Sequence, residues 1–124
     1  MSSVSASDFK NVTNLNYPNE DIEYILDLAI DTLNIYGNLS LDNMSGSAGS
    51  KTVDLTGRER AAVFHTARAI YQSFFKEPAT VSLAGLTVSI SDLMSNPTVE
   101  ASVRLMAKKL SGIAFKVGED TSGM

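Results

Sequence analysis

The sequence predicts a mainly α-helical protein, a small bundle of about four helices with one short β-hairpin between the third and the last helix. Apolar residues recur at helical spacing in four stretches, which indicates amphipathic helices. Two of these stretches begin with clear helix start signals. The hairpin is indicated by a short alternating stretch between two prolines. The predicted helices cover residues 5–15, 19–36, 57–76 and 97–112, and the hairpin covers 80–91.

Length and composition limit the class of protein. The chain has 124 residues, of which 44% are apolar and 19% charged, a balance typical of one globular domain. A formal net charge of −4 argues against nonspecific nucleic-acid binding as the main role. The chain has no cysteine, which excludes disulfides and thiolate metal sites. It shows no secretion signal and no apolar stretch of about 20 residues, so we expect a soluble protein with no membrane partner.

The first predicted helix follows a flexible N-terminus at residues 1–4. Ser5 or Ser7 provides its cap, and Asp8 lies in the first turn, where the helix dipole favours a negative charge. Asn19 is suited to cap the second helix, and Gly37 with the following asparagine is a typical helix stop.

The second helix carries a stripe of acidic residues, Glu23, Asp27 and Asp31, at intervals of four. Like charges at this spacing repel one another by a few tenths of a kcal/mol per pair. Three interpretations are open. The stripe is a solvated face, it meets basic residues of another helix or subunit, or it lines a surface that must not hold DNA.

The stretch 38–55 is rich in Ser, Gly and Asn, and its middle has no side chain able to pack. We expect a long mobile loop, a feature that is uncommon inside compact domains and often functional. Leu39, Leu41, Val53 and Leu55 alternate weakly around it, which allows a short strand pair at its base.

The third helix begins with a capping box formed by Thr56 and Glu59, the clearest start signal in the chain. The last helix begins at Asn96 and Pro97, a cap followed by proline at the first helical position. It carries Arg104 and Lys108 four residues apart on one side, and these are candidate basic partners for the acidic stripe.

The stretch 80–91 predicts two short strands joined by a two-residue turn. A two-stranded hairpin is marginal alone in water, so its apolar face needs a cover, either the helices of this chain or a neighbouring copy. The residues of this face, and hence candidates for a subunit interface, are Val81, Leu83, Leu86, Val88 and Ile90.

The C-terminal part of the domain, predicted to span 5–117, ends in an apolar alternating arm. Ile113, Phe115 and Val117 indicate a strand or arm that needs a partner surface. Residues 118–124 are polar and glycine-containing, and we expect them to be a disordered tail.

The sequence offers little of the chemistry that enzymes use. The single histidine, His65, lies inside the third helix, and none of its helical neighbours is a suitable metal ligand or acid–base partner. No nucleophile motif, phosphate-binding glycine loop or calcium loop is present. We therefore expect no catalytic residue, no metal and no cofactor.

The order of elements resembles the head–tail connector (adaptor) proteins of tailed phages. The segments that carry the resemblance are the acidic second helix NEDIEYILDLAIDTLNIYG, the third helix GRERAAVFHTARAIYQSFF, and GLTVSIS, which is similar to the family's short glycine- and serine-containing strand before the last helix. The resemblance covers residues 5–115 in element order. The Gly/Ser-rich loop is longer than in compact members of the family.

The resemblance implies a virion protein made in the host cytoplasm, which forms a ring, typically a dodecamer, beneath the portal and carries the next neck or tail protein. It implies no reaction, and DNA only as the passing genome. The hairpin is then a subunit contact and Ile113, Phe115 and Val117 dock on the portal. The acidic stripe either lines the DNA channel or pairs with Arg104 and Lys108 across a subunit boundary. The alternative is a small non-enzymatic helical module that binds a partner protein.

Overall fold

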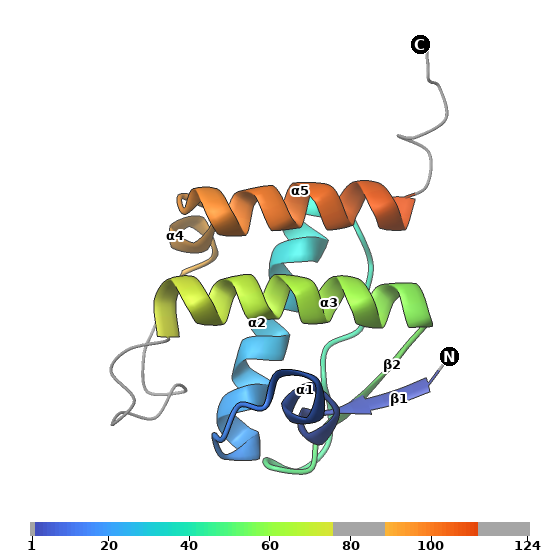
Figure 1. Cartoon of the computed structure of the whole chain (residues 1–124). Coiled ribbons are helices and arrows are strands. Elements are labelled where there is room, and N and C mark those ends of the chain that lie inside the picture. The colour runs from blue at the N-terminus through green and yellow to red at the C-terminus, as the bar shows by residue number, and fades with distance from the viewer. Residues whose placement is uncertain (1, 76–88, 112–124) are drawn as a thin grey trace.

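The computed structural model describes residues 2–75 and 89–111, which form a mainly helical domain (Figure 1). The predicted fold class is thereby confirmed. In the described residues, no helix is long and apolar enough to cross a membrane. The helical elements are α1 (Ala6–Thr13), α2 (Asn19–Gly37), α3 (Gly57–Ile70), its π-helical continuation η1 (Tyr71–Phe75), α4 (Ile90–Met94) and α5 (Pro97–Ser111).

Helix α2 is the centre of the arrangement, and α3 and α5 run across it side by side (Figure 1). These two helices are antiparallel, because Arg58 at the start of α3 donates a hydrogen bond to the carbonyl of Lys109 at the end of α5, at 2.7 Å. The short α1 packs near the beginning of α2, where the Lys10 ammonium donates to the Asn19 side chain at 3.0 Å. The two ends of α2 therefore have different neighbours.

The start signals predicted for the first, third and last helices operate as expected. The N–H of Glu59 donates to the Thr56 hydroxyl at 3.1 Å, and the N–H of Thr56 donates to the Glu59 carboxylate at 2.9 Å, which completes a capping box. At the start of α5, the Asn96 side-chain oxygen accepts from the N–H of Thr98 at 2.9 Å. The first α-helix is capped through Ser5, whose N–H donates to the carboxylate of Asp8 at 2.9 Å. The cap predicted at Asn19 is wrong, because Asn19 is the first residue of α2 and Pro18 occupies the N-cap position. The Asn19 side chain instead bonds to Lys10 and Gly49.

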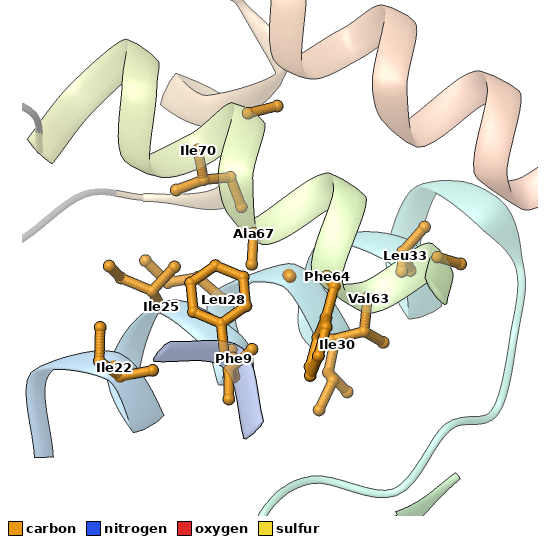
Figure 2. Close-up of a cluster of buried hydrophobic side chains, with 14 of the residues drawn as sticks. Phe9, Ile22, Ile25, Leu28, Ile30, Leu33, Val63, Phe64, Ala67 and Ile70 are labelled. Carbon is orange, nitrogen blue, oxygen red and sulfur yellow. The ribbon is translucent and has the colours of Figure 1, made fainter. Parts of the chain in front are cut away.

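The hydrophobic core lies between α1, α2 and α3, with α5 closing it from the side (Figure 2). The rings of Phe9 and Phe64 meet edge to face, with 5.2 Å between their centroids. Such pairs add about 0.5–1.5 kcal/mol beyond the area that they bury. The labelled core residues in Figure 2 are Phe9, Ile22, Ile25, Leu28, Ile30, Leu33, Val63, Phe64, Ala67 and Ile70.

A two-stranded antiparallel sheet joins β1 (Ser2–Ser5) to β2 (Thr52–Leu55), with Val4 opposite Val53. The prediction of a flexible N-terminus at 1–4 is therefore wrong for residues 2–4. Val4 is buried, and its strand partner comes from about fifty residues further along the chain. Local sequence patterns do not reveal such a distant partner. The weak alternation predicted around Val53 and Leu55 does form a strand, but it pairs with β1.

Most of the predicted hairpin at 80–91 lies outside the described residues, including Val81, Leu83, Leu86 and Val88. Ile90 is described, and its assignment to a strand is wrong. It is the first residue of α4, whose N-terminus is capped by the Ser89 hydroxyl accepting from the N–H of Asp92 at 3.1 Å. A serine cap outweighs strand alternation at this position, because it satisfies an N–H that a short helix would otherwise leave unpaired.

Candidate functional site

The side chain of Glu23 on α2 anchors the Gly/Ser-rich loop between α2 and β2. This side chain is only 3% exposed. Its two carboxylate oxygens accept hydrogen bonds from the backbone N–H groups of Gly49 and Lys51, each at 2.9 Å. Hydrogen bonds to a charged acceptor offset much of the cost of burying it. Glu23 therefore fixes the far end of the loop against α2.

Asp27 and Asp31 hold the near end of the same loop. One carboxylate oxygen of Asp27 accepts from the backbone N–H of Met44 at 3.0 Å. The side-chain amide of Asn43 donates to Asp31 at 2.9 Å and to Asp27 at 3.3 Å. Met44 is buried in the core, so these bonds hold in place a residue that also packs.

The prediction of a mobile loop over 38–55 is thus corrected, because α2 binds its middle and β2 forms its end. Gly49 adopts a φ of +87°, which other residues rarely adopt, while its N–H donates to Glu23. Its carbonyl accepts from the Asn19 side chain at 3.1 Å, and Asn19 in turn accepts from Lys10. The loop is linked in this way to both α1 and α2.

The acidic stripe consequently has an internal role that none of the three open interpretations described. They placed Glu23, Asp27 and Asp31 in solvent, against basic residues of another helix or subunit, or on a surface that faces DNA, and the solvated placement is wrong for the buried Glu23. The carboxylates of all three residues accept hydrogen bonds from the loop of the same chain. The sequence feature that accompanies this role is the stripe itself, followed within twenty residues by the glycine- and serine-rich stretch 45–50.

The predicted basic partners Arg104 and Lys108 lie on α5 and do not meet the stripe. Arg104 pairs with Glu100, one turn earlier on the same helix. Lys108 is exposed, and its ammonium has no partner among the described residues. The predicted pairing is one across a subunit boundary, and within one copy neither residue pairs with the stripe.

His65 faces α5 from α3, and its Nδ1 lies 2.7 Å from the hydroxyl of Ser102. Ser102 is 5% exposed, so this hydrogen bond braces two helices and does not present a reactive hydroxyl to solvent. A groove of about 620 Å³ runs beside the pair between α3 and α5. Its lining consists of His65, Arg68, Ala69, Gln72, Pro97, Thr98, Ala101 and Ser102.

Four large apolar side chains of the described residues are exposed, at three places on the surface. Val12 on α1 is 54% exposed. Ile35 and Tyr36, in the last turn of α2, are 63% and 48% exposed. Leu105 on α5 is 43% exposed. Helical periodicity places Tyr36 and Ile35 with the apolar residues of α2, but it does not show where the neighbouring elements end.

The predicted portal-docking residues Ile113, Phe115 and Val117 lie outside the described part of the chain. In the residues that are described, no group of three or more His, Cys, Asp and Glu side chains is placed to hold a metal ion. No protein-family model matches this chain, and neither a curated protein nor a solved structure is significantly similar to it. A functional proposal therefore rests on the residues themselves and on the resemblance in element order.

Proposed function

We propose that this chain is a structural subunit, a head–tail connector of the tailed-phage type that forms a ring beneath a portal and joins it to the next neck or tail protein. In this proposal the ring is located in the virion and the chain carries out no reaction. The resemblance in element order supports the proposal. The observation that carries it is the separation of the exposed apolar side chains.

Val12 and the Ile35–Tyr36 pair lie near opposite ends of α2. The Lys10–Asn19 hydrogen bond places α1, and with it Val12, beside the first turn of α2. Ile35 and Tyr36 occupy the last turn, where Gly37 meets α5. A helix of 19 residues is about 28 Å long at 1.5 Å per residue. The two apolar sites are thus separated by most of the domain.

Two separated sites fit a ring subunit better than a simple binding module. In a cyclic assembly of more than two copies, each subunit presents two different patches, one to each neighbour. A module with one partner needs only one such patch.

The groove between α3 and α5 favours the second candidate, a small helical module that binds a segment of a partner protein. Its volume of about 620 Å³ is within the range of ligand pockets. In this alternative the groove is the binding site, and Val12, Ile35 and Tyr36 have no role in association.

Electron microscopy of the purified protein, alone and mixed with capsids that lack a tail, tests the proposal. We expect rings with a central opening, or density added at a single capsid vertex. The variants Val12→Ser and Ile35→Ser/Tyr36→Ser should each weaken ring formation or attachment. Asn11→Ser, an exposed polar neighbour of Val12, is the matched control and should assemble normally.

A protein that stays monomeric at every concentration and binds no vertex would overturn the connector proposal. Binding of a partner protein that is lost on Arg68→Glu and unaffected by the Val12 and Ile35/Tyr36 variants would favour the groove-based module. Circular dichroism on each variant separates loss of assembly from loss of fold.

A further inference from the structure

Charge is divided unevenly between two parts of the domain. Residues 2–55 contain eight acidic and two basic residues, a formal charge of −6. The elements α3, η1 and α5 together contain two acidic and six basic residues, a formal charge of +4. A chain with a net charge of −4 therefore carries a distinctly basic pair of helices.

The outer face of α5 carries two of the free charges of this basic region. Lys108 and Lys109 are exposed, and neither ammonium has a partner among the described residues. Leu105, at 43% exposure, lies three and four residues before them, so the three side chains share one face of the helix. Arg104 beside them is already paired with Glu100. The face combines two unpaired cations with one exposed apolar side chain.

The acidic part of the domain has one surface with free carboxylates that fits this face. A hollow of about 360 Å³ is lined by Asp42 and Asp54 together with Asn43, Ser45, Thr52 and Val53. Both aspartates are exposed, and the structure gives neither carboxylate a hydrogen bond or ion pair within its described part. Glu23, Asp27 and Asp31 are by contrast occupied by the loop.

The two surfaces belong to different elements of the fold. Figure 1 shows α3 between α5 and the β1–β2 sheet, which contains Asp54, and among the described residues no ion pair joins Lys108 or Lys109 to Asp42 or Asp54. The free cations of α5 are therefore not neutralised by the free carboxylates of the same copy. Complementary patches at different places on one chain match a head-to-tail contact between copies.

We propose that the outer face of α5 in one copy, formed by Leu105, Lys108 and Lys109, docks on the Asp42–Asp54 hollow of a second copy. This inference rests on the proposed function and names the contact that would close the ring. It replaces the predicted partners Glu23, Asp27 and Asp31 with Asp42 and Asp54, two exposed carboxylates that have no partner among the described residues.

A single exposed ion pair stabilises such a contact by only about 0–1 kcal/mol. The charges therefore act mainly by orienting the two copies and raising the rate at which they associate. Burial of Leu105 supplies the apolar contribution, at about 25 cal/mol per Å². The contact should weaken with salt, since the screening length falls from about 10 Å at 0.1 M to about 3 Å at 1 M.

A charge-exchange experiment on the full chain tests the proposal. Lys108→Glu/Lys109→Glu makes both surfaces acidic, and Asp42→Lys/Asp54→Lys makes both basic. Each variant alone should self-associate at least about tenfold more weakly than the wild type. An equimolar mixture should associate again, because each contact then joins opposite charges. Sedimentation at low and high salt measures association, and circular dichroism confirms that each variant folds. Gln72→Glu, at an exposed position of η1, is a charge control that should associate as the wild type does.

The outcomes separate this inference from the proposed function. Rings that persist in both variants overturn the charge contact and leave the connector proposal intact. Loss of association in the single variants without recovery in the mixture also overturns the contact. If Lys108→Glu/Lys109→Glu abolishes binding of a short DNA duplex and leaves self-association unchanged, the face binds nucleic acid and the inference is wrong. Vertex attachment in microscopy tests the connector proposal independently of all three results.

Discussion

Gly37 at the end of α2 approaches Ala107 of α5 so closely that a methyl group at residue 37 would stand 2.8 Å from the Ala107 Cβ. Cβ atoms in proteins essentially never come this near to another carbon. The absence of a side chain at Gly37 therefore sets the distance between the two helices. The same junction carries the exposed Ile35 and Tyr36, so its geometry also positions one of the proposed assembly sites.

Gly37→Ala should destabilise the domain by about 1–3 kcal/mol, the usual cost of forcing extra volume into a packed contact. Alanine is a better helix former than glycine by up to about 1 kcal/mol, which reduces the loss without reversing it. Urea unfolding followed by circular dichroism measures the change. Gly57→Ala is the control, since a Cβ there meets no atom within 4 Å. Equal stability of the two variants would contradict the close approach.

Glu23→Ala should release the loop from α2 and destabilise the fold. It leaves the N–H groups of Gly49 and Lys51 without their acceptor, and an unpaired buried group costs about 1–3 kcal/mol. Hydrogen exchange of these two amides should accelerate more than the exchange of amides in α3. Glu20→Ala, an exposed acid on the same helix, is the matched control. Unchanged protection of Gly49 and Lys51 in Glu23→Ala would refute the anchoring role.

Thr66→Val should leave the stability unchanged or raise it by about 1 kcal/mol. The Thr66 hydroxyl is fully buried in α3, and it has no hydrogen-bond partner in the described structure. Replacing it with a methyl group of similar size removes the cost of an unpaired polar atom. Thr32→Val is the opposite case, because the Thr32 hydroxyl donates to the carbonyl of Leu28 at 2.6 Å. In thermal unfolding, the melting temperature of Thr66→Val should be higher than that of Thr32→Val. The reverse order would mean that the Thr66 hydroxyl has a partner.

Stability should fall as the pH rises from 10 to 12, and Tyr71 should be one cause. Burial, reinforced by the hydrogen bond and charge of neighbouring Tyr17, raises the pKa of Tyr71 from 10.0 to about 12. The unfolded chain loses the Tyr71 proton near pH 10, whereas the folded protein keeps it up to about pH 12. The stabilisation that comes from the raised pKa is therefore fully present below pH 10 and is lost as the pH rises through 12. The slope for one proton is at most about 1.4 kcal/mol per pH unit.

Tyr71→Phe should therefore flatten the decline of the unfolding free energy over this pH range. Urea unfolding at several pH values between 9 and 12 gives the slope for each protein. Tyr36→Phe, at an exposed tyrosine, should keep the wild-type slope. A Tyr71→Phe protein with the same decline would show that other groups account for it.

The sequence alone determined the helices whose signals are local. The capping box of Thr56 and Glu59, the cap at Asn96 and the helix stop at Asn38 each involve residues within a few positions, so side-chain chemistry and spacing specify them. The apolar periodicity that predicted helices at 19–36 and 57–76 corresponds to α2 and α3, which supply much of the core.

Only the tertiary structure decided how distant segments use the remaining polar groups. The sequence showed Glu23, Asp27 and Asp31 as a charged stripe, and the fold brings loop amides to them. It likewise pairs Val4 with Val53 and turns Ile90 from an expected strand into the start of α4. The physical reason is that backbone N–H and C=O groups are present at nearly every residue, so a sequence does not reveal which of them will meet a given side chain. Folding makes that choice when it buries Glu23, a charged group that then requires donors.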